Sequence, residues 1–211
     1  HTFTGSTNIV NRQSATAPFG RGWQLAGLDQ LAAQSGGVLL VRSDGTTLWF
    51  ADDGSGGYLH AEGDATYSTL VKHVDQSYTH SDTHGNDTHF SSTGLLTSRV
   101  DANGNTTSYT YTSGLLTQIT DPFSRATTFT YTSGRLTGVA DYASRSATLA
   151  YDASGRLTSI TQPDPDGAGA HSAPVTTFGY DATTHRLTSV TDALTQVTGY
   201  THGAHGRLTQ I

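Results

Sequence analysis

The sequence predicts an all-β protein built from stacked antiparallel β-hairpins, and three observations lead to that fold class. The 211 residues include 37 Thr, 21 Ser and 24 Gly; β-branched Thr favours strands, and Gly supplies turns. Lys and Glu, two of the best surface helix formers, occur once each, as Lys72 and Glu62. A short motif also returns through the second half of the chain, which is typical of stacked repeat folds.

The repeated motif reads Gly-Arg-Leu-Thr, Gly-Leu-Leu-Thr or, in one copy, His-Arg-Leu-Thr. Its copies start at residues 94, 114, 134, 155, 185 and 206, so successive copies are 20, 20, 21, 30 and 21 residues apart. The longest step contains residues 162–171, which are rich in Pro, Asp and Gly. That composition indicates a loop insertion in one repeat.

Each repeat is interpreted as a β-hairpin. In one repeat, residues 157–161 are predicted to form the short first strand. In another repeat, residues 101–105 are predicted to form the polar turn and residues 106–111 the return strand. The turn contains Asn-Gly, the strongest short-range hairpin signal. In the return strands aromatic residues lie two positions apart, as in Tyr109 and Tyr111, so they share one face. Because one hairpin cannot bury its own face, we expect stacked repeats to form a continuous apolar ladder.

Residues 151–160 read Tyr-Asp-Ala-Ser-Gly-Arg-Leu-Thr-Ser-Ile, which resembles the YD repeat of the bacterial RHS family. The resemblance covers residues 90–211 and recurs about five times. His185 replaces one Gly, and Thr112 and Thr132 replace the Asp of two repeats, so we expect looser turns there. The repeat-defining residues are Tyr111, Gly114, Leu116, Tyr131, Gly134, Arg135, Leu136, Tyr151, Asp152, Gly155, Arg156, Leu157, Tyr180, Asp181, Arg186, Leu187, Tyr200, Gly206, Arg207 and Leu208.

The resemblance carries an expectation about architecture. In RHS and teneurin-like proteins such repeats join into a long spiralling β-sheet, which closes into a hollow shell in the large members, often around a toxin. The resemblance therefore implies a spiral of stacked antiparallel β-hairpins, either open or part of a β-shell. It also divides the chain into an N-terminal RHS-type region with β-hairpins at residues 1–89 and YD repeats at residues 90–211.

The N-terminal region lacks the repeat but carries hairpin signals. Asp44-Gly45 lies between two apolar runs at residues 38–42 and 46–50. A further hairpin is predicted across residues 78–90. Residues 20–25, Gly-Arg-Gly-Trp-Gln-Leu, resemble the glycine-tryptophan segment that precedes the first repeats in many RHS proteins. Residues 25–34 fit either a short helix or an irregular strand.

Composition and charge exclude several functional classes. The net charge of −6 disfavours a nucleic-acid partner, because phosphate-binding surfaces are basic. No run approaches 18 apolar residues, so no membrane-spanning segment is expected. The chain has no Cys and no Gly-x-Ser-x-Gly nucleophile motif. We therefore expect no enzymatic activity, no catalytic residues and no cofactor.

Two groups of residues, the histidines and two Asn residues, are candidates for a metal site and for glycosylation. His73, His80, His84 and His89 lie among aspartates, and His80 and His89 are candidates to face each other across a hairpin. Their spacing matches no zinc motif, so solvated turn and strand residues are the favoured interpretation and no metal site is expected. N-glycosylation sequons start at two Asn residues in predicted turns. These are Asn86 and Asn105.

The resemblance implies a non-enzymatic structural section of an exported or cell-surface protein, with an extracellular or cell-surface location. Ile211 lies in the middle of a predicted hairpin, so we expect further repeats of the same chain or other copies of it to continue the sheet into a large shell or a fibre. Two alternatives stay open. The aromatic ladder and its hydroxyl-rich surroundings suit a carbohydrate-binding adhesion module with glycans as partners. The family's shells suggest part of a toxin-encapsulating RHS cage.

Overall fold

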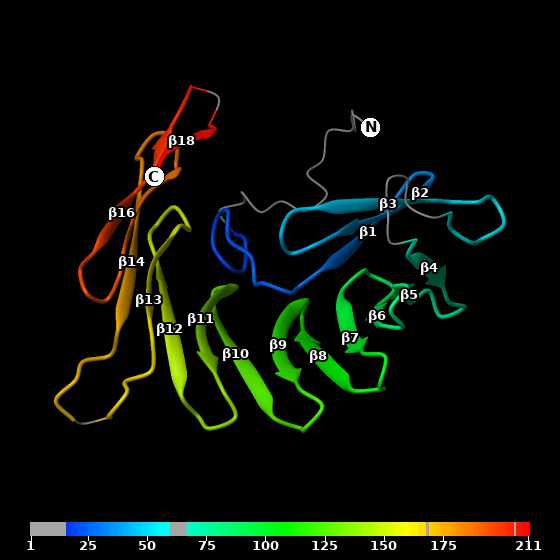
Figure 1. The fold of residues 1–211 in the computed structure, drawn as a ribbon, viewed down its shortest axis with the longest axis horizontal. Helices are drawn as coiled ribbons and strands as arrows, with labels where there is room; N and C mark the ends of the chain where they lie inside the picture. The colour runs from blue at the N-terminus through cyan, green and yellow to red at the C-terminus, as the bar shows by residue number, and fades with distance from the viewer. Residues whose placement is uncertain (1–15, 60–66, 168, 205) are drawn as a thin grey trace. The chain divides into compact units, whose positions relative to one another are not determined.

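The computed structural model describes residues 16–59, 67–167, 169–204 and 206–211, and every regular element in these ranges is a β-strand (Figure 1). The predicted all-β fold class is therefore confirmed. The described ranges contain no helix that could cross a membrane. The strands are β1 (Gln30–Gln34), β2 (Gly37–Val41), β3 (Thr47–Ala51), β4 (Thr69–Lys72), β5 (Tyr78–Ser81), β6 (Asp87–Phe90), β7 (Leu96–Val100), β8 (Thr106–Thr112), β9 (Leu115–Thr120), β10 (Ala126–Thr132), β11 (Arg135–Ala140), β12 (Ser146–Tyr151), β13 (Leu157–Thr161), β14 (Val175–Tyr180), β15 (Leu187–Thr191), β16 (Val197–Gly199), β17 (Thr201–His202) and β18 (Leu208–Gln210).

The chain divides into two compact units. The described part of the first unit lies within Gln24–Thr127, and that of the second comprises residues 16–23 together with Thr128–Ile211. The division expected between residues 89 and 90 concerns where the repeats begin rather than which residues pack together. It therefore stays a prediction.

The first unit holds two antiparallel sheets. Strands β1, β2 and β3 form a three-stranded N-terminal sheet, and strands β4 to β9 pair in sequence order in a repeat sheet. All of β2 is buried, as its continuous apolar run predicts for a strand covered on both faces. The core cluster draws on both sheets. It contains Leu31, Val38, Leu40, Phe50, Leu70, Tyr78, Phe90 and Leu96.

In the second unit, consecutive strands from β10 to β16 pair antiparallel, and β17 and β18 form a separate short hairpin. The register shifts by one residue beside the repeat tyrosine in three hairpins, at Tyr131, Tyr151 and Tyr180. Such a β-bulge sets two residues of one strand against one of its partner and increases the local twist. The sequence pattern did not predict these bulges.

The predicted hairpins of the N-terminal region are confirmed. Strands β2 and β3 pair around the Asp44-Gly45 turn, and β5 pairs with β6. Residues 162–174 form no strand in their described part, as predicted for a loop insertion. The helix considered for residues 25–34 is wrong, because Gln30–Gln34 forms β1 and pairs along its whole length with β2. Pairing with β2 buries Leu31, and this tertiary contact decides between the two local alternatives.

Candidate functional site

Many of the hairpins are closed by five-residue loops that begin with an aspartate, which we call Asp turns. In residues 101–105, the Asp101 Oδ1 accepts hydrogen bonds at 2.9 Å from the amides of Asn103 and Asn105. The Gly104 amide donates to the Asp101 carbonyl, and the φ of Gly104 is +83°, which glycine adopts without a Cβ clash. The same carboxylate pattern recurs at Asp82, Asp121, Asp141, Asp152 and Asp192.

The Asp of the Tyr-Asp motif therefore accepts the same turn-closing hydrogen bonds as the aspartate at the opposite end of the hairpin. Where Thr112 replaces it, Ser113 and Gly114 form a two-residue turn in which both φ values are positive, as in a type I′ turn. Thr112 then pairs directly with Leu115. The turn is tighter than an Asp turn, so the expectation of a looser turn at this position is wrong. The repeat with Thr132 has the same tight turn.

Hydrogen bonds lower the pKa of four Asp-turn carboxyl groups, those of Asp82, Asp101, Asp121 and Asp141, below the ordinary value of 3.8. The largest cause at Asp101 is the side-chain hydrogen bond from Asn105, and at Asp121 it is that from Arg125. A carboxyl group with a lower pKa in the folded chain stabilises the fold above its ordinary pKa. That stabilisation is lost as the pH falls through the folded value.

We therefore expect the chain to lose stability in acid, partly because of these turns. Replacing Asp82, Asp101, Asp121 and Asp141 together by Asn keeps an oxygen acceptor for the turn amides but removes the titrating group. The urea midpoint of the unaltered chain should fall between about pH 5 and about pH 3, and that of the fourfold variant should fall less. An equally steep fall in both would show that other carboxylates dominate the acid response.

The arginine of the motif links one repeat to the next. Arg156 forms an ion pair with Asp152 in its own Asp turn. Its Nη1 donates to the Asp181 carbonyl of the following repeat at 3.3 Å, and its guanidinium carbon lies 5.4 Å from the centre of the Tyr180 ring. An arginine stacked on an aromatic ring gains cation–π attraction. The side chain thus couples two successive motif turns.

Neighbouring repeats show parts of the same arrangement. The Arg135 guanidinium carbon lies 5.9 Å from the centre of the Tyr151 ring. The Arg186 Nη1 donates to the Gly203 carbonyl at 3.4 Å. Arg207, in the last repeat of this chain, is exposed.

The other repeat-defining residues differ in burial along the chain. The tyrosines at 111, 131, 151, 180 and 200 are all partly buried. Burial raises the pKa of Tyr131 and Tyr151 to about 12. Leu116, Leu136 and Leu157 are buried, whereas the corresponding leucines of the last two repeats are not. The roles assigned to these residues from the repeat pattern stay predictions.

A segment from the N-terminal region crosses the motif turns of the second unit, and we call residues 17–23 the strap. The Leu136 amide donates to the Pro18 carbonyl at 2.8 Å. The Arg21 amide donates to the Gly155 carbonyl at 2.9 Å. Backbone hydrogen bonds therefore join the strap to two successive repeats.

Trp23 attaches the end of the strap to a third repeat. Its indole Nε1 donates to the Tyr180 hydroxyl at 2.9 Å, and that hydroxyl donates to the Leu157 carbonyl at 2.8 Å. The Trp23 and Phe178 rings meet edge to face with centres 4.8 Å apart, a favourable aromatic geometry. The sequence revealed the glycine-tryptophan segment, but it did not predict that this segment contacts the repeats.

We expect Trp23 and Tyr180 to be energetically coupled. Replacing Trp23 by Phe keeps a ring against Phe178 but removes the N–H donor. Urea unfolding of Trp23→Phe, Tyr180→Phe and the double variant should give a coupling energy of about 1 kcal/mol. Strictly additive losses in this cycle would contradict the hydrogen bond.

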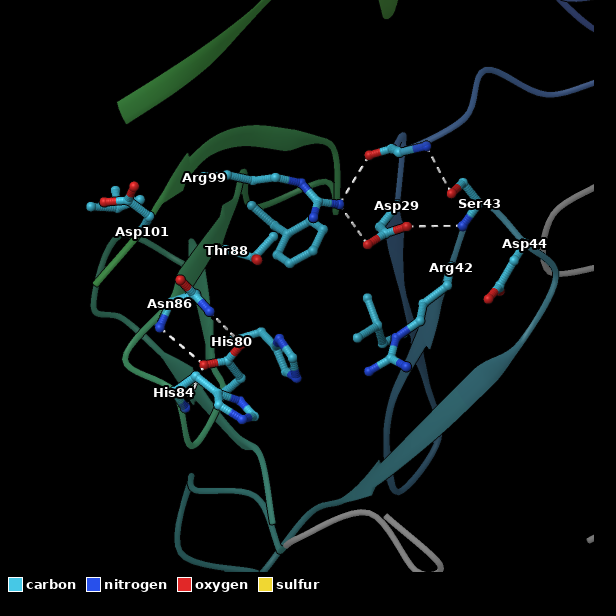
Figure 2. Close-up of a pocket in the computed structure, with 15 residues that line it drawn as sticks. Asp29, Arg42, Ser43, Asp44, His80, His84, Asn86, Thr88, Arg99 and Asp101 are labelled. Atoms are coloured by element: carbon cyan, nitrogen blue, oxygen red, sulfur yellow. Dashed lines mark hydrogen bonds and ion pairs between the residues drawn. The ribbon is translucent and has the colours of Figure 1, made fainter. Parts of the chain in front are cut away.

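In the first unit, four residues form a clasp between the N-terminal sheet and the repeat sheet (Figure 2). The Arg99 Nη2 donates to Asp29 Oδ2 at 2.7 Å and to the Gly27 carbonyl at 2.9 Å. The Ser43 amide donates to Asp29 Oδ1 at 2.8 Å, and the Gly27 amide donates to the Ser43 hydroxyl at 2.8 Å. The Asp29 side chain is 15% exposed, so the ion pair is partly shielded from water.

The clasp borders a cavity of about 540 Å³, which we call the clasp pocket. Figure 2 shows His80, His84 and Asn86 on one wall, carried by β5 and the Asp turn that follows it. Arg42 and Asp44 lie on the opposite wall, in the turn between β2 and β3. The histidines stood out in the sequence, but nothing in the sequence placed them opposite the β2–β3 turn.

The register of β5 and β6 separates two of the histidines. The register of β5 and β6 pairs His80 with Thr88 and Thr79 with His89, so the expectation that the two histidines face each other is wrong. Adjacent pairs point to opposite faces of a sheet. Among the described residues, no group of three or more His, Cys, Asp or Glu side chains is placed to hold a metal ion.

The two Asn residues of the sequons lie at the ends of Asp turns. The Asn86 Nδ2 donates to Asp82 Oδ2 at 2.8 Å, and the Asn105 Nδ2 donates to Asp101 Oδ2 at 2.7 Å. Each amide nitrogen therefore already helps to close its turn. Glycosylation at these positions stays a prediction.

Some aromatic residues of the return strands pack inside the protein. Tyr109 packs against the core cluster of the first unit. Phe129 is only 7% exposed. Glycan binding by the aromatic ladder stays a prediction.

Comparison with known proteins finds one family model and several solved structures that this chain resembles. The family model described as RHS Repeat matches residues 112–141, 132–167 and 180–211. The solved structure titled TcdB2-TccC3 without hypervariable C-terminal region is 13% identical over 85% of this chain and 12% of that chain, with a TM-score of 0.40. The structure titled TcdB2-TccC3-TEV is 17% identical over 82% of this chain and 9% of that chain, with a TM-score of 0.44. This chain thus spans about a tenth of each neighbour's length. No curated protein matches it.

Proposed function

Because this chain is a protein of the RHS-repeat family, we propose that it forms a structural section of a larger β-shell, in which further repeats continue its sheet. In this role the chain forms part of the wall of the shell and catalyses no reaction. The aspartates that recur along it hold hairpin turns, as at Asp101 and Asp152, rather than converging on a shared substrate position. An exported or cell-surface location belongs to the same proposal.

The observation that carries the proposal is the loss of burial at one repeat position. Leu136 and Leu157 are 3% and 2% exposed, Leu187 is partly exposed, and Leu208 is 48% exposed. The strap contacts the repeats of Leu136 and Leu157 but has no described contact with the repeat of Leu208. A repeated apolar residue that becomes exposed at one end of a stack indicates an unfilled neighbour position.

The arginine contacts support the same continuation. Arg156 and Arg186 each donate to a backbone carbonyl of the following repeat. Arg207 holds the corresponding position in the last repeat and is exposed. In the proposed shell, Arg207 donates to a carbonyl of the next motif turn, and a further strand pairs with the exposed edge of the sheet.

The mass of the polypeptide in its native source tests this role. An antibody raised against this chain should detect, on a denaturing gel, a polypeptide far heavier than 22.2 kDa, and mass spectrometry should find this sequence inside it. A mature polypeptide of this mass that stays monomeric in light scattering would overturn the shell. One of this mass that polymerises would replace the shell with a fibre of copies.

Hydrogen exchange tests the continuation at residue level. The amides of β18 should exchange more slowly in the longer native polypeptide than in the 211-residue chain, because a following repeat would cover Leu208. The amides around the buried Leu136 serve as the internal control and should exchange alike in both. Equal, fast exchange of β18 in both proteins would contradict the proposed neighbour.

A further inference from the structure

Two histidines of the first unit direct a ring nitrogen at the same hydroxyl group, and we call them the imidazole pair. The His73 Nε2 and the Thr79 Oγ1 are hydrogen-bonded at 2.7 Å. The same Oγ1 is hydrogen-bonded to the His89 Nδ1 at 3.0 Å. The two nitrogens therefore converge on one small region, although His73 follows β4 and His89 lies in β6.

The strands beneath the imidazole pair are held by the core. Thr79 and His89 are direct partners in the pairing of β5 with β6, so their side chains share one face of the repeat sheet. Their chain neighbours Tyr78 and Phe90 belong to the core cluster and are 5% and 1% exposed. Because these rings fix the backbone from the other face, the imidazole pair is positioned before any ligand arrives, which lowers the entropic cost of binding.

The turn that carries His73 is also ordered and holds a negative charge. The His73 amide donates to the Ser77 carbonyl at 2.8 Å, and the His73 carbonyl accepts from the Gln76 amide at 2.9 Å. In the same turn, Asp75 Oδ1 accepts from the hydroxyl and the amide of Ser77. These bonds, above all that from the hydroxyl, lower the pKa of Asp75, so its carboxylate is ionised at neutral pH. A carboxylate beside His73 favours a cationic ligand.

The positive charge near this turn lies on the other face of the sheet. Lys72 pairs with Tyr78, and its Nζ lies 5.7 Å from the centre of the Tyr78 ring. On the face of the imidazole pair, the cross-strand neighbours are Val71 and Ser98, which carry no charge. A cation bound there is therefore not repelled by the side chains that flank it in the sheet.

Two converging imidazoles suit a transition-metal ion. Imidazole nitrogen is a ligand for Zn²⁺, Ni²⁺ and Cu²⁺, whereas Mg²⁺ and Ca²⁺ prefer oxygen ligands. The Thr79 hydroxyl has one proton, so it donates to no more than one of the two nitrogens. Each ring presents a lone pair at the nitrogen that faces this hydroxyl when its proton sits on the other ring nitrogen. Because the described residues contain no group of three or more metal-binding side chains, water completes the coordination of the ion.

We propose that the imidazole pair binds a divalent transition-metal ion of the Zn²⁺ class, which links the turn after β4 to strand β6. Among the described residues, β4 is the end strand of the repeat sheet, so the ion fastens this end to the strands that follow. The inference does not depend on the shell role, because all of these residues lie within the first unit. Sequence spacing did not predict the site, because the pairing of β5 with β6 brings the two histidines together.

Calorimetric titration of the full chain with ZnCl₂ is the first test, and we expect one saturable site. His73→Ala and His89→Ala should each raise the Kd for Zn²⁺ by at least about tenfold, because each removes one of two protein ligands. The matched control is His84→Ala, which alters an exposed turn histidine of the same unit and should leave the Kd unchanged. Excess Mg²⁺ should not displace the ion. Absence of a saturable site, an unchanged Kd in both ligand variants, or displacement by Mg²⁺ would each overturn the proposal.

Folding is checked separately for each variant by circular dichroism without metal. His73 is exposed, so His73→Ala should fold normally, whereas His89 is partly buried. If His89→Ala fails to fold, His73→Ala decides together with NMR, in which Zn²⁺ should shift the imidazole signals of both His73 and His89. Shifts confined to other histidines would place the ion elsewhere and overturn the site.

Hydrogen exchange tests the link between the β4 end and β6. Saturating Zn²⁺ should slow exchange of the β4 and β5 amides, because the ion binds the folded end of the sheet and opposes its opening. The amides of the second unit are the internal control and should not change. His73→Ala should abolish the slowing. Equal slowing in both units, or slowing that persists in His73→Ala, would contradict a link at the imidazole pair.

Discussion

Replacing Gly94 by alanine is expected to unfold the first unit under conditions in which the unaltered chain is folded. Gly94 has a φ of +82°, and an added Cβ would overlap the carbonyl oxygen of Leu31. Leu31 cannot easily move aside, because its residue pairs with Leu40 of β2 and its amide donates to the Gly94 carbonyl at 2.9 Å. The combined cost should exceed about 3 kcal/mol.

Gly114→Ala is the matched control for this substitution. Gly114 lies in the next motif turn with a φ of +79°, and nothing lies within 4 Å of an added Cβ. It should therefore lose only the cost of a left-handed alanine, about 1 kcal/mol. Urea unfolding followed by circular dichroism measures both losses. Equal losses would contradict the close approach of β1 to the motif turn at Gly94.

Replacing Leu136 by aspartate is expected to have the largest effect in the second unit. Leu136 is 3% exposed, and its amide is bonded to the strap through the Pro18 carbonyl. A carboxylate at this position would lose its hydration without gaining a described cationic partner. Losses of about 3–5 kcal/mol follow from an uncompensated buried charge. The thermal midpoint and the urea midpoint should both fall accordingly.

The same substitution at Leu208 is the control for Leu136→Asp, since both leucines occupy the same repeat position. Leu208 is 48% exposed, so its aspartate stays hydrated and should cost less than about 1 kcal/mol in the 211-residue chain. A thermal midpoint unchanged by Leu136→Asp would show that the face assigned to this leucine is wrong. A large loss in Leu208→Asp would show that a neighbouring molecule already covers it.

Features that depend on neighbouring residues could be predicted from the sequence. Asn103-Gly104 and Asp44-Gly45 mark hairpin turns because only certain residues tolerate the required backbone angles. The alternation of aromatic residues in β8 follows from the period of a strand. The repeat spacing likewise predicts the sequential pairing of strands, because a short connection leaves a strand little choice of partner.

Features that join distant residues could not be predicted in the same way. The sequence marked Trp23 as part of a familiar segment, but its partner Tyr180 is 157 positions away. The clasp pairs Asp29 with Arg99, which lies 70 positions away. No local pattern encodes such pairs, because backbone geometry and side-chain period act only within a few residues.

The order of residues is enough to identify this chain as a series of antiparallel hairpins with a repeated leucine and a repeated Tyr-Asp turn. Backbone geometry and side-chain period act within a few residues, so these properties can be read directly from the order of residues. Packing between distant segments sets which leucines are buried, where the strap lies in the second unit, and that His84 stands opposite Arg42. Burial and pocket walls depend on which segments pack together, and Thr-rich strands fit either face of a sheet equally well.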